Sequence, residues 1–411
     1  MLPGGFIDRL ASMVGDNVAG RFAESCAQEA PASVRLNPFK QPNTPLDILE
    51  GSSPIPWNSF GRFLRARPNF TLDPLFHAGA YYVQDSSAMY VGQVFRSLAS
   101  RLSDSRPLRV LDLCAAPGGK TTDLAASLRG ICGDGFLLVA NEVMRKRASV
   151  LSENVAVWGD PRVMVTSADP GRFAEFEGFF DVIVADVPCS GEGMFRKDER
   201  ACEEWSEELV SMCAARQRRI LSDVWPALRR GGLLIYSTCT FEPEENDGNF
   251  EWALGSLGAE VIEVEVPEGA IATKFGALFV PGVSMGEGQY VAAAVKTSGS
   301  DSSRAKEMDL ARLHPLRFTP EKGVWKGKDF VPDPDWALSL MYQRGDWPEA
   351  ELDARTALAF LHRDSIVLPD APLGYVTVTY GGLPLGFVKN LGRRTNNLLP
   401  LGRRILMDIN R

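Results

Sequence analysis

The chain has 411 residues, of which 45% are hydrophobic and 23% are charged. This composition is typical of a folded globular protein and excludes a chain that is mostly disordered, collagen-like or of low complexity. With 44 Lys and Arg against 52 Asp and Glu, the formal net charge is −8. That charge excludes a uniformly basic surface for non-specific nucleic-acid binding, but it leaves room for a local basic patch.

The predicted elements alternate between strands and helices from residue 108 onward. In chain order they are a strand over 108–113, a helix over 121–128, a strand over 136–140, a helix over 145–157, a strand over 180–185, an amphipathic segment over 203–228 and a strand over 232–236. Short apolar strands that alternate with helices indicate a parallel sheet with helices on both faces. The predicted fold class is therefore α/β, a doubly wound sheet.

Short polar segments mark the expected boundaries of this α/β unit. Residues 103–107 and 297–303 have the composition of linkers. They divide the chain into an N-terminal region 1–106, a central domain 107–298 and a C-terminal region 299–411. In the last region, 374–380 and 385–388 are expected to form a β-hairpin around Gly381 and Gly382.

Charge is distributed unevenly over these regions. Residues 101–300 carry 20 basic and 30 acidic side chains, whereas residues 389–411 carry six basic side chains and one acidic side chain. An acidic centre is thus followed by a basic tail, and a basic tail favours contact with a polyanion.

Targeting and metal signals are weak. No run of residues approaches the ~18 consecutive apolar residues of a membrane-spanning helix, and the first residues lack the pattern of a signal peptide. Seven scattered cysteines without a C-x-x-C pair, together with three isolated histidines, favour neither a disulfide framework nor a metal site. We therefore expect a cytoplasmic protein with no metal and no membrane contact, and we take a monomer as the starting hypothesis.

The first candidate site is the loop after the strand over 108–113. Residues 114–120, Cys-Ala-Ala-Pro-Gly-Gly-Lys, lead from this strand into the next helix. Small residues let the backbone approach a ligand closely, and amides at a helix start face it. Such loops hold nucleotide-like cofactors at the carboxyl edge of a parallel sheet, although this one matches neither the dinucleotide-binding motif nor the P-loop.

An acidic residue follows the second strand. Glu142 stands where a carboxylate would accept hydrogen bonds from the ribose hydroxyls of such a cofactor. The alternative interpretation is a solvated position near the start of the next helix, because helix N-termini favour acidic residues.

Two thiols are expected at the same sheet edge. The strand over 180–185 leads into Asp186 and then Cys189, and the strand over 232–236 leads into Cys239. Because the carboxyl ends of parallel strands share one edge, the thiols and the carboxylate are predicted to face one cleft. Apolar core filling is the interpretation for the other thiols considered, which are Cys26, Cys132, Cys202 and Cys213.

Three blocks of this sequence strongly resemble RNA cytosine-5 methyltransferases of the Nol/Nop/Sun type, which use S-adenosylmethionine. The blocks are Leu-Asp-Leu-Cys-Ala-Ala-Pro-Gly-Gly-Lys at 111–120, Asp-Val-Pro-Cys-Ser-Gly-Glu-Gly-Met-Phe-Arg-Lys at 186–197 and Tyr-Ser-Thr-Cys-Thr at 236–240. Residues 34–37 and 82–87 are similar to N-terminal segments of the family, so the resemblance covers about residues 33–298. Residues 385–392 are more weakly similar to the tail of the ribosomal small-subunit methyltransferase F branch.

The resemblance implies a fold and three regions. The central domain would be a Rossmann-like class I methyltransferase. The N-terminal region would be an α+β RNA-recognition domain, and the C-terminal region would be a mostly β, PUA-like RNA-binding module.

The resemblance also implies residue roles. A thiolate that adds to C6 of cytosine lets C5 take a methyl group from a sulfonium. Cys239 matches the nucleophile, and Cys189 matches the second cysteine, which helps to release the methylated base. Asp186 would hydrogen-bond the base near N3, and Lys120 matches a lysine that organises the active site. The residues implied to hold S-adenosylmethionine are Cys114, Ala115, Ala116, Pro117, Gly118, Gly119, Lys120, Glu142, Asp169 and Asp186.

Within that set, Glu142 would hold the ribose and Asp169 would meet the adenine. The sequence departs from the family pattern at two places. Asp85 stands where Glu is expected, and Pro170 follows Asp169 where many relatives have Gly.

The implied partner is RNA, with small-subunit ribosomal RNA or the 30S subunit favoured because the accessory region follows the catalytic domain. The target base would have to come from a loop or be flipped out of a helix. Phosphate contacts are expected from the basic tail and from Arg62, Arg65, Arg67, Arg196 and Lys197.

Four alternatives stay open. A transfer-RNA cytosine-5 methyltransferase would carry the same catalytic motifs. A DNA cytosine-5 methyltransferase would use Cys189 as its nucleophile and would not require Cys239. A non-catalytic RNA-binding assembly factor with a methyltransferase fold would not need both thiols, and a small-molecule methyltransferase would not need the flanking regions.

Overall fold

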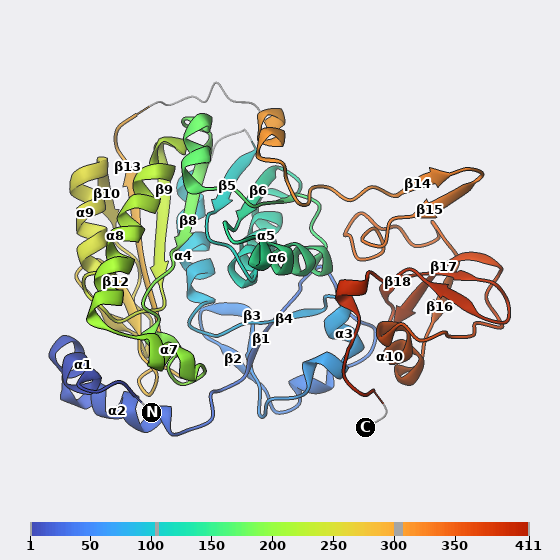
Figure 1. The fold of residues 1–411 in the computed structure, drawn as a ribbon, viewed down its shortest axis with the longest axis horizontal. Coiled ribbons are helices and arrows are strands. Elements are labelled where there is room, and N and C mark those ends of the chain that lie inside the picture. Colours follow the sequence, from blue (N-terminus) through green and yellow to red (C-terminus); the bar gives the residue numbers. More distant parts are fainter. Residues whose placement is uncertain (1, 103–106, 300–306, 410–411) are drawn as a thin grey trace.

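The computed structural model describes residues 2–102, 107–299 and 307–409. Its centre is a nine-stranded sheet in the order β11-β12-β13-β9-β8-β5-β6-β7, with β10 paired to β13 (Figure 1). Five of its strands are parallel neighbours, and four of these five were predicted. They are β5 (Leu108–Asp112), β6 (Phe136–Asn141), β7 (Val163–Thr166), β8 (Phe180–Asp186) and β9 (Leu228–Thr238).

The sheet also contains antiparallel strands, which were not predicted. A block of antiparallel strands extends it beyond β9, through pairs such as Tyr290 with Thr238. These strands are β10 (Ala259–Ile262), β11 (Ile271–Ala272), β12 (Gly276–Phe279) and β13 (Gln289–Lys296). Their alanine and glycine content gives only a weak strand signal, since neither residue favours strands intrinsically.

Helices cover both faces of this sheet because successive strand residues point to opposite sides. Val110 and Val182 pack in one hydrophobic cluster, and Leu111 and Ile183 pack in the other. The first cluster includes side chains of α4 (Tyr90–Ala99), α5 (Gly119–Cys132) and α6 (Arg145–Trp158). The second includes side chains of α1 (Phe6–Val14), α2 (Asp16–Cys26), α8 (Glu207–Val224) and α9 (Asp247–Leu257).

The amphipathic segment predicted over 203–228 is not one helix. It contains the end of α7 (Glu199–Glu204), all of α8 and the 3₁₀ turn Trp225–Ala227. The break falls at Ser206, whose side chain accepts a hydrogen bond of 3.1 Å from the Leu209 amide. Serine is a preferred N-cap because its oxygen satisfies a free amide at a helix start.

Two smaller sheets flank the centre. The N-terminal sheet has the order β2-β3-β1-β4 and the C-terminal sheet the order β16-β17-β18-β19. The N-terminal elements are β1 (Ser33–Leu36), β2 (Ser53–Ile55), β3 (Asn58–Phe63), β4 (Tyr81–Val83) and α3 (Pro74–His77). The C-terminal elements are β14 (Gly323–Lys326), β15 (Asp329–Pro332), β16 (Glu349–Glu351), β17 (Gly374–Tyr380), β18 (Leu383–Asn390), β19 (Thr395–Asn397) and α10 (Ala354–His362).

The hairpin predicted in the C-terminal region is confirmed. Strands β17 and β18 pair antiparallel from Gly374 with Asn390 to Tyr380 with Leu383. Gly381 and Gly382 form the turn, with φ values of 56° and 73°. Both values lie in the left-handed region, which a tight two-residue hairpin turn requires and glycine adopts at low cost.

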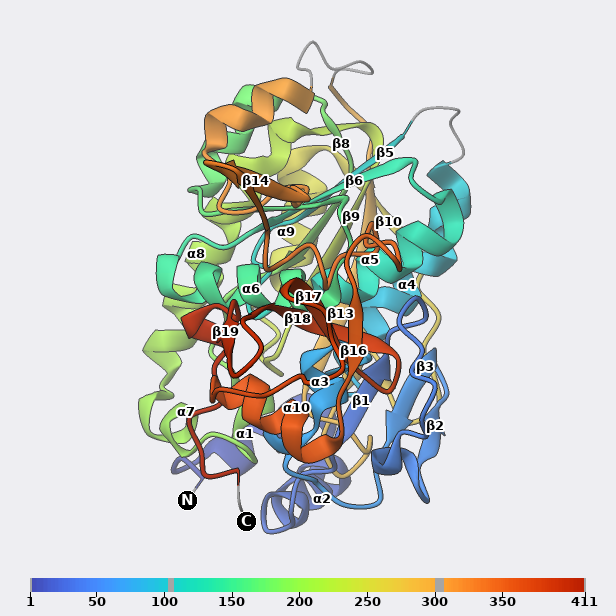
Figure 2. The same cartoon turned by 90° about the vertical axis from the view of Figure 1, so that its right-hand side faces the viewer.

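The N-terminal and C-terminal sheets share one hydrophobic core. Val34 and Tyr81 pack in the same cluster as Phe360 and Val376. Figure 2 shows the C-terminal sheet and α10 in front of α3 and β1. The flanking regions are therefore packed together, and each lies against the central domain.

Short 3₁₀ turns connect many of these elements, and parts of the two expected linkers lie outside the described residues. The other turns are Asp47–Leu49, Phe70–Leu72, Ser100–Leu102, Pro170–Phe176, Glu192–Met194, Glu307–Leu313 and Leu401–Arg403. The predicted linkers, 103–107 and 297–303, include residues 103–106 and 300–303, which lie outside the described residues. No helix in the described part of the chain is long and apolar enough to cross a bilayer.

Candidate active site

The carboxyl ends of β5, β8 and β9 bring the predicted catalytic residues together. Asp186, the last residue of β8, pairs in register with Ser237 of β9. The loop after β5 begins beside them, since the Leu113 amide donates to the Val184 carbonyl at 2.9 Å. Lys120, Asp186, Cys189 and Cys239 therefore meet at one sheet edge.

The two thiols form a close pair. The Sγ atoms of Cys189 and Cys239 are 3.2 Å apart, and the Cys239 amide donates to Cys189 Sγ at 3.3 Å. The hydrogen bond with Cys239 and then burial raise the pKa of Cys189 well above that of an ordinary thiol. Cys189 therefore holds its proton tightly, and it can donate that proton in a hydrogen bond to a thiolate at Cys239.

A lysine and a glutamine hold the carboxylate beside these thiols. Lys120 Nζ lies 2.8 Å from Asp186 Oδ2 and 3.4 Å from Gln289 Oε1. Burial lowers the pKa of Lys120, but the charge and hydrogen bond of Asp186 outweigh this effect, with a further contribution from Cys239, and the pKa is raised. Ser237 Oγ donates to Asp186 Oδ1 at 2.7 Å, so the carboxylate is fixed from both sides.

The loop of small residues after β5 is also held firmly. The Ala115 amide donates to the Asn141 carbonyl at 2.8 Å, and Asn154 Nδ2 donates to the Pro117 carbonyl at 2.8 Å. Gly118 has φ 113° and directly precedes α5. A Cβ atom there would lie 3.2 Å from a methyl group of Leu151, so both the backbone conformation and the space favour glycine.

Two buried carboxylates at this edge each have one oxygen that accepts no hydrogen bond in the described structure. Asp112 Oδ2 accepts from Thr121 at 2.6 Å, while Oδ1 has no partner among the described residues. Burial raises the pKa of Asp112 to about 7. Glu142 Oε1 accepts from the Met144 amide at 2.9 Å, and Oε2 makes no hydrogen bond, although it lies 3.0 Å from Arg147 Nη1 in an ion pair.

These carboxylates make this edge of the sheet electronegative. The pKa of Cys114 is raised first by burial and then by the charges of Asp186, Glu142 and Asp112. A buried oxygen without a partner is costly unless a ligand satisfies it. The cleft thus suits a ligand that carries hydrogen-bond donors and positive charge.

Asn141 joins the ends of three neighbouring strands. Its Nδ2 donates to the carbonyls of Leu113 and Ala168 at 3.2 and 3.0 Å, and its Oδ1 accepts from the Ala168 amide at 2.9 Å. Asp169 follows Ala168 and is exposed, and its side chain caps the turn Pro170–Phe176 by accepting from Gly171 at 3.0 Å. The residues predicted for the cofactor therefore lie in a row along β5, β6 and β7.

A second group of buried acidic residues lies behind the thiols. The Glu245 carboxylate accepts from the Ser190 hydroxyl, from the Ser190 amide at 3.2 Å and from Gln217 Nε2 at 2.6 Å. Ser190 Oγ also lies 3.1 Å from Thr240 Oγ1. This group links the residue after Cys189 to the residue after Cys239.

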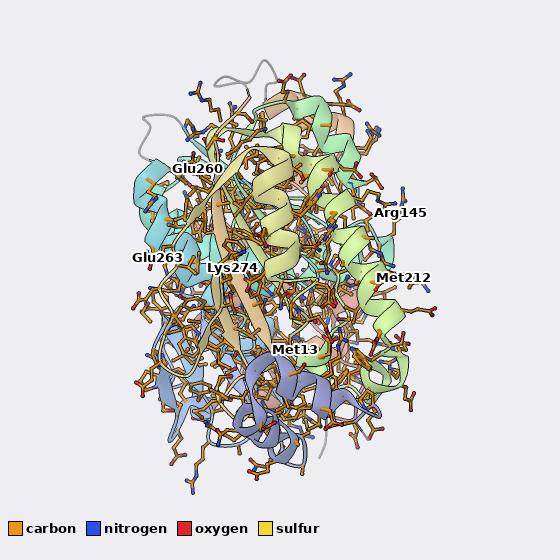
Figure 3. All side chains as sticks on the ribbon, turned by 90° about the vertical axis from the view of Figure 1, so that its left-hand side faces the viewer. Met13, Arg145, Met212, Glu260, Glu263 and Lys274 are labelled. Atoms are coloured by element: carbon orange, nitrogen blue, oxygen red, sulfur yellow. The ribbon has the colours of Figure 1, made fainter. Side chains whose placement is uncertain are left out.

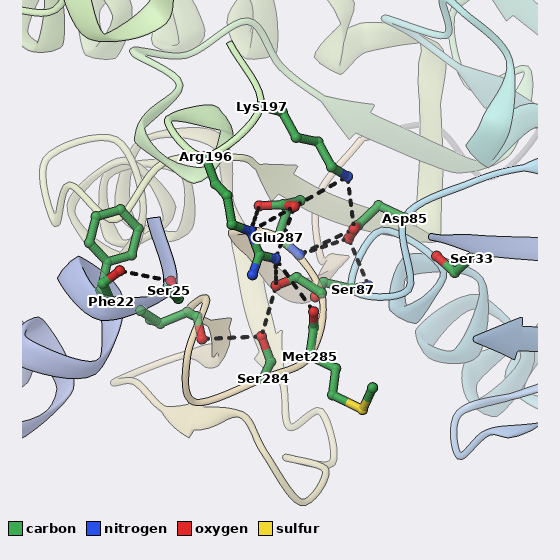
Figure 4. A network of polar contacts seen from close by, with 12 residues as sticks. Phe22, Ser25, Ser33, Asp85, Ser87, Arg196, Lys197, Ser284, Met285 and Glu287 are labelled. Carbon is green, nitrogen blue, oxygen red and sulfur yellow. Dashed lines mark hydrogen bonds and ion pairs between the residues drawn. The ribbon is translucent and has the colours of Figure 1, made fainter. Parts of the chain in front are cut away.

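Arg196 does not have the predicted role in phosphate contact. Its guanidinium binds Glu287 at 2.9 Å, and the side chain is only 5% exposed (Figure 4). Lys197 bridges Glu287 and Asp85 at 3.3 and 3.5 Å and is 28% exposed. Arg196 is thus a buried structural cation, and the contact predicted for Lys197 stays a prediction.

The remaining thiols differ in exposure. Cys202 and Cys213 are buried, as predicted for core fillers, whereas Cys26 and Cys132 are half-buried. In the described ranges there is no group of three or more His, Cys, Asp or Glu side chains that could hold a metal ion.

Sequence reasoning missed Asp112, Asn141, Gln289 and Glu245. An acidic residue and an amide at successive strand ends were visible signals for the first two, because strand ends in this fold line the ligand cleft. Gln289 lies on an antiparallel strand that was not predicted, and Glu245 lies in a run of acids that resembles a solvated loop.

Family comparisons agree with this architecture. A model described as 16S rRNA methyltransferase RsmB/F matches residues 100–295. The N-terminal domain of 16S rRNA methyltransferase RsmF matches residues 2–86, and the methyltransferase RsmF PUA domain matches residues 348–405.

Curated relatives carry the same name. The ribosomal RNA small subunit methyltransferase F of Serratia proteamaculans is 30% identical over 99% of this chain and 97% of its own length. That of Enterobacter sp. is 32% identical over 94% and 92%. That of Escherichia coli is 36% identical over 56% of this chain and 48% of its own length.

Solved structures share the fold. A methyltransferase homologue from Pyrococcus horikoshii has a TM-score of 0.58 and 27% identity over 71% of this chain and 94% of its own. NSun6 from Pyrococcus horikoshii, solved with the S-adenosylmethionine analogue SFG, has a TM-score of 0.58 and 18% identity over 72% of this chain and 98% of its own. The chain belongs to the RsmB/F family of 16S rRNA methyltransferases and has the N-terminal and PUA-like domains of the RsmF type.

Proposed function

We propose that this protein transfers a methyl group from S-adenosylmethionine to C5 of a cytosine in small-subunit ribosomal RNA, through a covalent bond between Cys239 and C6 of the base. The observation that carries the proposal is the pair of thiols, 3.2 Å apart, beside Asp186 and Lys120 at one edge of the sheet. Family membership and the names of the relatives support ribosomal RNA as the substrate.

The cleft fits the cofactor. S-adenosylmethionine would supply the methyl group from its positively charged sulfonium, and it also carries an ammonium group. Asp112 Oδ1 and Glu142 Oε2, which accept no hydrogen bond in the described structure, are acceptors for donors of this kind, although Glu142 is also paired with Arg147. Residues 114–120 would hold the amino-acid part, Glu142 the ribose and Asp169 the adenine edge, with Asp186 between the cofactor and the base.

Cys239 is the nucleophile in this mechanism. Its thiolate adds to C6, which makes C5 electron-rich enough to take the methyl group. Asp186, which Lys120 holds in place, hydrogen-bonds the base near N3 as C6 is attacked. Release then requires loss of the C5 proton and cleavage of the bond between Cys239 and C6. Cys189 is the residue that we assign to this release.

Radiolabelled S-adenosylmethionine and total RNA, separated by size, test the proposal. Wild-type protein is expected to label small-subunit ribosomal RNA, and Cys239→Ala is expected to label nothing. Cys189→Ala should instead accumulate a protein–RNA adduct that survives denaturing electrophoresis. Cys132→Ala, at a half-buried thiol outside this cleft, is the matched control and should behave like wild type.

Each other outcome has a defined meaning. Label in transfer RNA would keep the chemistry and change the substrate. Adduct formation that depends on Cys189 rather than Cys239 would favour the DNA-type nucleophile. Methylation that survives Cys239→Ala would overturn the covalent mechanism.

The domain limits are part of the proposal. An N-terminal RNA-recognition domain over 1–106, a catalytic domain over 107–298 and a PUA-like RNA-binding region over 299–411 would together hold the substrate. We also propose that the protein acts in the cytoplasm as a monomer, and that its substrate is RNA or the 30S subunit.

A further inference from the structure

An exposed hairpin lies between two of the segments that the family models match. Strands β14 and β15 fall within residues 296–347, between the family models that match 100–295 and 348–405. They pair from Gly323 with Pro332 to Lys326 with Asp329, around a two-residue turn. Gly327 opens this turn with φ 64°, which suits a tight hairpin. Figure 1 shows the hairpin at the outer end of the C-terminal region, away from β8 and β9.

A ladder of aromatic rings runs along this hairpin to the protein core. Phe387, which is fully buried, packs edge-on against Trp347 at 4.9 Å, and Trp347 stacks on Phe330 at 6.4 Å with 12° between the planes. Phe330 then meets Trp325 edge-on at 5.3 Å. The inner three rings explain how the hairpin is anchored.

Trp325, the outermost ring of the ladder, has no such structural use. Its side chain is 72% exposed, next to an exposed valine, Val324. Exposing a ring of this size to water is unfavourable by about 25 cal/mol for each Å² of apolar surface. A rigidly presented, exposed aromatic ring is what base stacking requires.

Two exposed lysines follow the exposed ring in the hairpin. Lys326 and Lys328 are exposed, and neither forms an ion pair with any residue described here. Asp329, which pairs in register with Lys326, is already bound by Lys389 of β18 at 2.6 Å. The turn after Lys389 adds two more exposed cations, Arg393 and Arg394. In contrast, acidic side chains such as Glu260 and Glu263 lie on the opposite side of the molecule (Figure 3).

We propose that Trp325, Lys326 and Lys328 form a contact site for single-stranded RNA, in which one base stacks on Trp325 and the lysines bind the flanking phosphates. This site rests on the proposed function, because it would hold a part of the same RNA remote from the target cytosine. Stacking gives sequence-tolerant affinity, and the lysines give salt-dependent affinity.

Binding of a fluorescein-labelled 20-nucleotide single-stranded RNA of mixed sequence tests the site directly. Trp325→Ala should weaken binding about 5- to 100-fold, the range expected for loss of one stacked base. Trp325→Phe should restore most of it. For Lys326→Ala with Lys328→Ala, the slope of log affinity against log salt should become shallower by about 1.4, since each phosphate contact to a single strand contributes about 0.7.

Met212→Ala and Arg219→Ala are matched controls. Both side chains are exposed and belong to α8, and Figure 3 shows Met212 on the side of the molecule opposite the hairpin. Neither substitution should change the affinity. An affinity for single-stranded RNA that is the same in wild type and Trp325→Ala would overturn the proposal.

Methylation of transcribed 16S ribosomal RNA separates this inference from the proposed function. Trp325→Ala should raise KM and leave kcat unchanged, because the hairpin is far from the cysteines. Absence of methylation by the wild type would contradict the proposed function itself. If the wild type methylates normally and Trp325→Ala has an unchanged KM, the hairpin site alone is rejected. A defect of Trp325→Ala that is seen with intact 30S subunits but not with naked RNA would reject it as well.

Discussion

Glu245 is the residue that most directly couples the two cysteines. Burial raises the pKa of Glu245 to about 8. The Ser190 hydrogen bond opposes this effect, and the charge of Glu192 adds to it. The ionised carboxylate in turn raises the pKa of Cys189, as does Glu192. The other titratable groups that face this pocket, Cys213 and Tyr236, also have raised pKa values, so Glu245 is the acid that gains charge as the pH passes 8.

Glu245→Gln should therefore change the pH profile more than the rate at neutral pH. A glutamine can donate to the Ser190 hydroxyl and accept from Gln217, so the geometry is preserved. Above pH 8 the wild type should release the methylated base more slowly than the variant, because the charge on Glu245 keeps the proton on Cys189. Measuring kcat and adduct accumulation from pH 6 to 9.5 tests this. Glu244→Gln is the control, since that side chain is 56% exposed, and identical profiles for Glu245→Gln and wild type would contradict the assignment.

The same residue shows why part of the site could not be predicted. Cys189 and Cys239 were predictable because each stands in a turn after an apolar strand, and topology then places the two turns together. Glu245 stands in the run Glu242–Glu245, which has the composition of a solvated loop. Only the packing of Gln217 and Ser190 against it distinguishes the buried Glu245 from the exposed Glu244.

At the scale of elements, the turn Glu192–Met194 sets the position of the Cys239 backbone. The Gly193 amide donates to the Cys239 carbonyl at 2.8 Å. A Cβ on Gly193 would lie 2.7 Å from that carbonyl and 2.7 Å from the Cα of Gly288, and neither backbone atom can move freely. Gly193→Ala should displace the cysteine and lower kcat about 10- to 100-fold, because small displacements of a reacting group are costly.

A second glycine provides the control. Gly255 lies within α9, and a Cβ there would meet no atom within 4 Å. Gly255→Ala should leave kcat unchanged and stabilise the protein by about 1 kcal/mol, the usual gain from alanine in a helix. Circular dichroism and thermal unfolding of both variants separate displacement from misfolding. A Gly193→Ala protein with normal kcat would show that this contact is dispensable.

Element prediction succeeded where a single local signal was strong. Four of the five parallel strands, β5, β6, β8 and β9, are short apolar runs between turn residues, and their predicted limits agree with the structure to within four residues. Strand β7 was not predicted. Strand β13 was missed although it supplies Gln289, because its Ala292–Ala294 run has no intrinsic strand preference. Its pairing with β9 comes from tertiary packing, which no local window of sequence contains.

At the scale of the whole molecule, the flanking regions are one packed unit rather than two appendages. The cluster that contains Val34, Tyr81, Phe360 and Val376 would be opened by removing residues 299–411. Such a truncation would expose apolar surface of the N-terminal sheet, so loss of activity in the truncated chain would not by itself identify an RNA-binding role. Point substitutions on exposed residues are the sharper test.

Lys40 lies where the three regions meet. Its Nζ donates to the Ala78 carbonyl at 3.1 Å and to the Val157 carbonyl of α6 at 2.6 Å. The C-terminal region also contacts this junction, because the Leu340 amide donates a hydrogen bond of 2.9 Å to the Gly159 carbonyl. Burial, and then the charge of Arg403, lower the pKa of Lys40 to about 7, and no carboxylate in the described structure pairs with it.

This shift predicts how the junction responds to pH. Between pH 7 and the ordinary lysine value of 10.5, the unfolded chain binds the Lys40 proton and the folded chain does not. Lys40 should therefore increase the free energy of unfolding as the pH rises, by at most about 1.4 kcal/mol per pH unit. Lys40→Met removes this contribution, so the stability of wild type relative to the variant should increase from pH 7 to pH 9.

Urea unfolding of wild type, Lys40→Met and the exposed control Lys328→Met at pH 7, 8 and 9 measures that difference. The control should follow the wild type at every pH, because Lys328 is exposed and lies outside this junction. If the free energy of unfolding changed with pH in the same way for wild type and Lys40→Met, Lys40 would keep its charge in the folded protein. In that case the junction would have to be open enough for water to reach Nζ, which contradicts the close packing of the three regions.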